Sequence, residues 1–225
     1  MRRQLIAPLL RESIGINEDK PVHKTIVFSD IVKSSSKWRD NPKEMIEVIE
    51  NFTSVVDAKL NIYDGLTIKT IGDAFMFAFD SLKEAIHFAI DIQEYLLENP
   101  YEISGEKLLL RIGICAGDVY EATSVIQNEN LKDYLGNTVN TASRIESKVC
   151  EEGDVAFTYL HEDEIDKEDI DTIIGEYETE VVSFTNDGNE IKRSGRLLTN
   201  IQRHKYEDVD ELKGIDEIDV YKIQM

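Results

Sequence analysis

The stretch that decides the fold of this chain is Leu66–Phe79, which reads Leu-Thr-Ile-Lys-Thr-Ile-Gly-Asp-Ala-Phe-Met-Phe-Ala-Phe. Two runs rich in β-branched and aromatic residues flank the dipeptide Gly72-Asp73. Glycine reaches a positive φ without steric cost, so a dipeptide of this kind between two such runs predicts a tight β-hairpin. Because both strands are apolar at nearly every position, we expect the hairpin to be buried on both faces except at its tip.

Two charged side chains interrupt this apolar hairpin. Asp73 lies at the predicted turn, where a carboxylate is either solvated at the surface or holds a ligand. Lys69 lies in the first strand between Ile68 and Thr70, and two interpretations fit it. Its aliphatic stem follows the sheet edge while the ammonium group reaches water, or the cation serves a binding site. The hairpin alone leaves both interpretations open.

The composition is that of an acidic globular protein. The chain has 225 residues, 41% of them hydrophobic, which is enough for one large domain or two small ones with a sizeable core. The net charge of −20 argues against affinity for nucleic acid or for anionic membrane surfaces. A polyanionic substrate would therefore need a locally positive pocket or bound cations.

Further features indicate a cytoplasmic protein. The two cysteines, Cys115 and Cys150, lack the spacing of metal ligands and indicate a reducing compartment. No apolar run approaches the roughly 18 residues of a membrane span. The N-terminus has no long apolar stretch and no cleavage site, so we expect no signal peptide.

The predicted elements follow the order strand, helix, strand, strand, helix, strand. Capping boxes at Asn41–Glu44 and Ser81–Glu84 begin the two helices, and a polar loop with three serines precedes the first box. The first and last strands of this order are Thr25–Phe28 and Leu108–Ile114. This βαββαβ order is typical of ferredoxin-like folds, so the sequence predicts an α+β fold with a ferredoxin-like core.

This topology predicts a metal site. The first strand ends at Asp30, and the end of that strand neighbours the tip of the central hairpin, which carries Asp73. Two carboxylates this close repel each other unless a cation lies between them. Oxygen ligands without histidine or cysteine favour Mg²⁺ or Mn²⁺. The alternative is that the two are unrelated surface aspartates.

A second polar constellation lies on a predicted helix after Gly136. Asn137 is a plausible N-cap, and Asn140 and Arg144 are four residues apart, so they share one face. An amide beside a guanidinium suits a ribose and a phosphate. It equally suits a solvated helix face, and the spacing does not decide between the two.

We expect one domain over residues 24–225, preceded by an N-terminal arm at residues 1–23. Residues 160–206 form an acidic, peripheral insertion in this interpretation. Within it, Val181–Lys192 predicts a hairpin. The last segment predicts a closing strand that includes Tyr221.

Four ordered motifs together resemble the catalytic domain of class III nucleotidyl cyclases, the adenylate and guanylate cyclase family. The resemblance extends over about residues 24–222. The motifs are Val27–Val32 (Val-Phe-Ser-Asp-Ile-Val), Ile68–Asp73 (Ile-Lys-Thr-Ile-Gly-Asp), Arg111–Ile114 (Arg-Ile-Gly-Ile) and Asp133–Arg144 (Asp-Tyr-Leu-Gly-Asn-Thr-Val-Asn-Thr-Ala-Ser-Arg). The resemblance implies conversion of a nucleoside triphosphate to a 3′,5′-cyclic nucleotide and pyrophosphate.

The resemblance also implies which residues bind metal and base. Asp30 and Asp73 match the metal-binding aspartates, with the Ile31 carbonyl as a further ligand for two Mg²⁺ or Mn²⁺ ions per active site. Lys69 and Asp133 match the pair that hydrogen-bonds adenine in adenylate cyclases. Guanylate cyclases typically carry a glutamate and a cysteine at those two positions.

The remaining implied roles concern the sugar, the phosphates and the assembly. Asn140 matches the residue that positions the ribose, Arg144 the one that stabilises the transition state, and Lys213 a lysine that contacts the triphosphate. In this family the active sites lie between two subunits. Because this chain has both sets of residues, the resemblance implies a head-to-tail homodimer.

Several functional hypotheses follow. The leading one is a cyclase that makes cyclic AMP from ATP, without nucleic-acid or membrane partners. A pyrimidine cyclase of bacterial antiphage defence, making cyclic CMP or cyclic UMP, is the alternative. A non-catalytic nucleotide-binding module usually lacks a metal aspartate or the arginine, and this chain keeps both. A diguanylate cyclase relative would carry a Gly-Gly-Asp/Glu-Glu-Phe hairpin, and this sequence contains none.

With the domain starting near residue 24, we expect regulation through a partner, expression or small signals.

Overall fold

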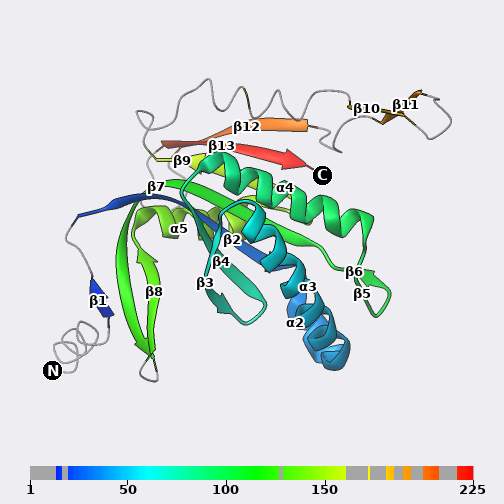
Figure 1. Ribbon diagram of the computed structural model, residues 1–225, viewed down its shortest axis with the longest axis horizontal. Helices are drawn as coiled ribbons and strands as arrows, with labels where there is room; N and C mark the ends of the chain where they lie inside the picture. Colours follow the sequence, from blue (N-terminus) through cyan, green and yellow to red (C-terminus); the bar gives the residue numbers. More distant parts are fainter. Residues whose placement is uncertain are drawn as a thin grey trace.

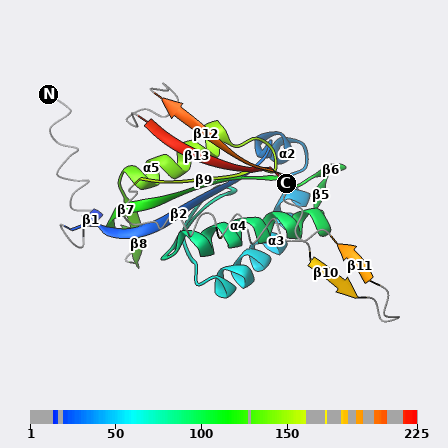
Figure 2. The same cartoon turned by 90° about the horizontal axis from the view of Figure 1, so that it is seen from above.

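The computed structural model describes residues 14–16, 20–126, 129–160, 172, 181–184, 190–193, 200–207 and 217–224. Within that part of the chain, nine strands form one sheet with the main order β12-β13-β9-β7-β2-β4-β3 (Figure 1). Helices α3 and α4 cover one face of the sheet, and α5 lies on the other (Figure 2). The elements of the first half are β1 (Ile14–Ile16), β2 (Val22–Ile31), α2 (Ser34–Asp40), α3 (Pro42–Ile62), β3 (Leu66–Ile71), β4 (Ala74–Phe79), α4 (Leu82–Glu98), β5 (Glu102–Ile103) and β6 (Glu106–Lys107).

The second half supplies the long strand of the sheet and its outer strands. Its elements are β7 (Leu110–Ile126), β8 (Glu129–Leu135), α5 (Asn137–Arg144), the π-helix η1 (Ile145–Val149), β9 (Val155–Tyr159), β10 (Val181–Phe184), β11 (Glu190–Arg193), β12 (Asn200–Glu207) and β13 (Glu217–Gln224). The predicted peripheral hairpin is confirmed as β10 paired with β11, and the predicted closing strand is β13. The N-terminal segment before residue 14 lies outside the described residues.

The ferredoxin-like core is confirmed. Strands β7, β2, β4 and β3 lie side by side in that order, all antiparallel, and α3 and α4 connect them in the βαββαβ sequence. Strand β9 extends this core because it pairs in parallel with β7. Strands β9 and β12 were not predicted from the sequence, and both lie on the β7 side of the sheet.

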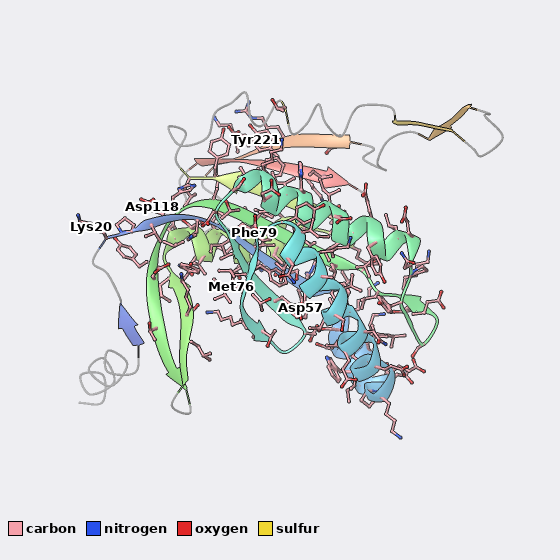
Figure 3. The ribbon with its side chains drawn as sticks, in the orientation of Figure 1. Lys20, Asp57, Met76, Phe79, Asp118 and Tyr221 are labelled. Atoms are coloured by element: carbon pink, nitrogen blue, oxygen red, sulfur yellow. The ribbon has the colours of Figure 1, made fainter. Side chains whose placement is uncertain are left out.

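The central hairpin is buried in one strand only. In β4, the odd-numbered phenylalanines pack into the cluster with α3 and α4, while Met76 and Ala78 pack on the other face. Met76 and Phe79 are labelled in Figure 3. The expectation that both strands are buried is wrong for β3, whose residues are exposed or half-buried. The reason is position: β3 is the last strand in the main order of the sheet and is hydrogen-bonded to β4 on one side only.

Two further expectations were wrong at helix starts. The three serines predicted to lie in a loop begin α2, and the side chain of Asn41 does not cap α3. Instead, Asn41 and Glu44 both hydrogen-bond Ser104, on the turn between β5 and β6. The second box holds at its first residue, since the Ser81 hydroxyl accepts a hydrogen bond from the Glu84 backbone N–H at 3.3 Å.

Strand β7 is much longer than predicted and belongs to two parts of the structure. Its first part lies in the sheet between β2 and β9, and its second part pairs with β8 to form an arm that leaves the sheet (Figure 1). The arm leads into α5, which begins at Asn137 itself. The N-cap is Gly136, so the expectation that Asn137 caps the helix is wrong.

Candidate active site

The strand register brings Asp30 and Asp73 to the same end of neighbouring strands. Ser29 of β2 lies opposite Phe75 of β4, which places Asp30 one residue beyond that pair and Asp73 two residues before it. Neighbouring strands are about 4.8 Å apart, so the two backbones are close at this edge. Asp73 follows Gly72, which has a φ of 67° at the hairpin turn, a conformation that glycine adopts without strain.

Asp30 is held by a neighbouring cation on β7. Arg111 lies opposite Asp30 in the register of β2 and β7, and its Nη2 donates to Oδ2 of Asp30 at 2.6 Å. The other side of the same guanidinium faces Glu146 of η1, with Nε 3.2 Å from Oε1. Arg111 therefore lies between two carboxylates. Neither Arg111 nor Glu146 was predicted from the sequence as a site residue, although an arginine inside a buried strand was a usable signal.

Glu146 has an unusual protonation equilibrium. Burial raises the pKa of its carboxyl to about 7, with a smaller contribution from the negative charge of Asp30, while the charge of Arg111 acts in the opposite direction. The side chain is 10% exposed, so the desolvation cost of the carboxylate is real. A proton therefore binds Glu146 more tightly in the folded protein than in the unfolded chain.

This linkage predicts a pH-dependent stability difference between the wild type and Glu146→Gln. A raised pKa means that the stabilisation by the bound proton is present below about pH 4.5 and is lost as the pH rises through about 7. Raising the pH from 5 to 8 should therefore favour the variant by about 2 kcal/mol relative to wild type. Urea unfolding of both proteins at both pH values measures this, and an unchanged difference would contradict the assignment.

Asp73 is held from helix α2 rather than from β7. Trp38 Nε1 donates to Oδ1 of Asp73 at 3.3 Å. The second oxygen, Oδ2, is buried and makes no hydrogen bond among the described residues. A buried, unpartnered carboxylate oxygen is costly unless a cation or a donor reaches it.

These donors fit a hard divalent cation. Among the residues that the structure describes, no group of three or more His, Cys, Asp or Glu side chains is arranged so that it could hold a metal ion. The chain therefore offers Asp30, Asp73 and the backbone of Ile31, which ends β2. Mg²⁺ typically uses one or two carboxylates together with water and substrate phosphates. The buried Oδ2 of Asp73 is the oxygen that would bind such an ion.

Lys69 and Asp133 form a direct ion pair across two strands. Nζ of Lys69 lies 2.8 Å from both carboxylate oxygens of Asp133, and the side chains are 36% and 22% exposed. Lys69 belongs to β3 and Asp133 to β8, so the arm lies next to the edge strand at this place. The backbone N–H of Tyr134 also donates to Oδ1 of Asp133, at 2.8 Å. The ammonium group of Lys69 therefore has a carboxylate partner at the sheet edge, and its role in base binding stays a prediction.

A β-bulge determines which face Lys69 occupies. Thr67 lies opposite Phe77, but Lys69 lies opposite Met76, so one extra residue is accommodated in β3. Without that bulge Lys69 would lie opposite Phe75, on the face of the phenylalanine cluster. The bulge moves its ammonium group to the face of Met76, where β8 and Asp133 lie.

Asn140 and Arg144 lie one turn apart on α5, with Asn140 exposed and Arg144 half-buried. The helix lies very close to β7 because Gly113 has no side chain. A Cβ at Gly113 would be 2.3 Å from the backbone nitrogen of Glu146 and 2.6 Å from the carbonyl of Ala142. The position of the polar face of α5 thus depends on this glycine. Lys213, the expected triphosphate lysine, lies outside the described residues.

The fold and these motifs define a class III nucleotide cyclase catalytic domain. The family described as the adenylate and guanylate cyclase catalytic domain matches residues 18–172. That match covers more than half of the chain, and the chain therefore belongs to this family. Among the described residues, none of the helices has the length and apolar character needed to cross a membrane.

Individual relatives include both types of cyclase. The chain is 34% identical over 152 residues to the adenylate cyclase of Lachancea kluyveri, covering 59% of this chain and 8% of that protein. It is 28% identical over 152 residues to guanylate cyclase soluble subunit beta-2 of Homo sapiens, covering 63% of this chain and 24% of that protein. The chain thus spans a small part of the length of these relatives.

Solved structures share the fold. The catalytic core of a rhodopsin-guanylyl cyclase with converted specificity, in complex with ATPalphaS, has a TM-score of 0.64 with this chain at 22% identity. The alignment covers 92% of this chain and 99% of that one. This likeness shows that the two chains share a fold.

Proposed function

We propose that this protein converts ATP to cyclic AMP and pyrophosphate. The single observation that carries the choice of substrate is the ion pair between Lys69 and Asp133, at 2.8 Å, in a chain of the cyclase family. The paired carboxylates at the ends of β2 and the hairpin, and the polar face of α5, provide the other groups that the reaction needs. In this reaction the ribose 3′-oxygen attacks the α-phosphorus and pyrophosphate leaves.

Asp30, Asp73 and the Ile31 carbonyl would hold two divalent ions. Such ions lower the pKa of the attacking 3′-hydroxyl and neutralise charge on the phosphates. The carboxylates fix the place of the ions, and Arg111 fixes one of these carboxylates through its contact with Asp30 Oδ2. In a chain with a net charge of −20, the two bound ions would supply the positive charge that a triphosphate needs in order to approach.

Asn140 and Arg144 act on the sugar and the phosphate in this proposal. An amide at Asn140 donates to or accepts from the ribose oxygens and orients the 3′-hydroxyl. The guanidinium of Arg144 meets the negative charge that grows on the phosphate in the transition state. Because that charge is greatest in the transition state, Arg144 acts on turnover more than on substrate binding.

The ion pair has hydrogen-bonding capacity left for a base. An ammonium group has three donors, and Lys69 uses two of them on Asp133. A carboxylate has about four acceptor positions, and Asp133 fills three with Lys69 and the Tyr134 N–H. One donor and one acceptor remain, which matches the N1 acceptor and N6 amino donor of adenine. Guanine presents the inverse pattern and would leave polar groups mismatched.

Comparing the four nucleoside triphosphates tests this choice of substrate. Cytosine repeats the pattern of adenine on a smaller ring, so hydrogen bonding to Lys69 and Asp133 alone does not exclude CTP. We expect ATP to react fastest, CTP to be the nearest competitor, and GTP and UTP to be poor. Initial rates at equal concentrations with Mn²⁺ measure the order, and a clear preference for GTP or UTP would contradict the assigned role of Lys69 and Asp133.

A homodimer with shared active sites completes the proposal. Large apolar side chains are exposed on both sides of the ion pair: Leu66 and Ile71 on β3 are 55% and 59% exposed, and Leu131 on β8 is 44% exposed. Exposed apolar side chains grouped on neighbouring elements are typical of interaction surfaces. A second copy of this chain, docked head to tail, would cover them and bring its own aspartates to the base-reading pair.

A further inference from the structure

We propose that Trp38 is a positioning residue for Asp73. It holds the carboxylate by donating a hydrogen bond to one of its two oxygens. The inference rests on the proposed function, in which Asp73 binds a divalent cation. Trp38 lies on α2 and reaches across 35 residues of sequence to donate its indole N–H to Oδ1 of Asp73 at 3.3 Å. An indole N–H is a donor only, so this contact can serve only an acceptor.

The contact makes the two oxygens of Asp73 different from each other. Oδ1 accepts the hydrogen bond from Trp38, while Oδ2 is buried and makes no hydrogen bond among the described residues. A cation bound by Asp73 would therefore find Oδ2 to be the oxygen without a competing donor. Trp38 thus selects the oxygen and fixes the rotation of the carboxylate around its terminal bond.

Trp38 is itself held firmly enough for this role. Its ring packs against the main hydrophobic cluster between the sheet and α3 and α4. The preceding residue, Lys37, is 5% exposed, and its Nζ lies 3.1 Å from Glu106 of β6. Helix α2 is therefore anchored at consecutive residues. The hairpin tip needs such support because β3 is an edge strand and Ile71, just before the turn, is exposed.

The composition provides a direct probe, because Trp38 is the only tryptophan of the chain. The ¹H–¹⁵N spectrum of the wild-type protein should therefore contain one indole N–H signal. We expect that signal to shift in a saturable way when MgCl₂ is added, because an ion on Oδ2 withdraws charge from the oxygen that accepts the indole proton. Asp73→Asn should abolish the shift.

A matched pair of variants measures the effect on metal affinity. Trp38→Phe removes the N–H and keeps an aromatic ring against the core. Free Mn²⁺, followed by its paramagnetic resonance signal, should show that this variant binds the ion about 10- to 100-fold more weakly, as is usual when a hydrogen bond to a metal ligand is removed. Arg39→Ala is the control on the same helix, because Arg39 is 75% exposed and pairs with Asp40 beside it. We expect its affinity to equal that of wild type.

The outcomes separate this inference from the proposed function. If wild type binds Mn²⁺ but the indole signal ignores Mg²⁺, or if folded Trp38→Phe binds Mn²⁺ as wild type does, the role of Trp38 is wrong and the metal site stands. If wild type and Asp73→Asn bind Mn²⁺ alike, the metal assignment of Asp73 is wrong and the inference falls with it. Should Trp38→Phe not fold, the titration of the wild type decides alone.

Discussion

Replacing Asp30 or Asp73 with asparagine should lower turnover by about 10³-fold or more while the protein stays folded. Each substitution keeps the shape of the side chain and removes the charge that holds the cations. Several kcal/mol of transition-state stabilisation depend on those cations, and each 1.36 kcal/mol corresponds to a factor of ten. Pyrophosphate release from ATP in the presence of Mn²⁺ measures the loss, and circular dichroism checks the fold.

The chain offers a matched control for this experiment. Asp80 is also an aspartate at the end of a strand of the same sheet, but it is 84% exposed and pairs with Lys24. Asp80→Asn should therefore retain nearly full activity. Near-normal, metal-dependent activity in folded Asp30→Asn or Asp73→Asn would show that the carboxylates at this edge do not hold the catalytic ions.

Combining two inactive chains should restore activity. Asp73→Asn damages the metal half of a site, and Arg144→Ala damages the half that stabilises the transition state, at a cost of about 10²- to 10³-fold. If these halves come from different subunits, a heterodimer of the two variants contains one site with both defects and one intact site. It should therefore have about half of the wild-type activity per dimer.

Two different affinity tags and sequential purification isolate this heterodimer. The control preparations are the two homodimers, each of which carries one defect in both of its sites and should show less than about 1% of wild-type activity. If the heterodimer is as inactive as the homodimers, Asp73 and Arg144 act within one chain and the head-to-tail arrangement is wrong.

The sequence predicted those features that depend on local pattern and topology. The hairpin at Gly72-Asp73 and the βαββαβ order were enough to place Asp30 and Asp73 at one edge of the sheet, as the register has it. The burial of β3 was predicted wrongly, because apolar alternation cannot reveal that a strand lies at the edge of a sheet. The resemblance to cyclases paired Lys69 with Asp133, and the ion pair between β3 and β8 agrees with that pairing.

Other features depend on long-range contacts that no local pattern encodes. Trp38 followed three serines that indicated a loop, yet these serines begin a helix that carries the indole to a residue 35 positions away. Glu146 lies two residues after Arg144 in the sequence, and no local pattern indicates that it is buried beside Arg111. Both side chains acquire their roles only when separate elements pack together.

The bulge in β3 makes the proposed base-binding pair, Lys69 and Asp133, sensitive to the number of residues in a strand as well as to their identity. A chain that kept Lys69 but lost the extra residue next to it would turn the same lysine toward the phenylalanine side of the hairpin. Single-residue insertions and deletions in this strand are therefore a route by which base recognition can be gained or lost during evolution while every functional residue is retained.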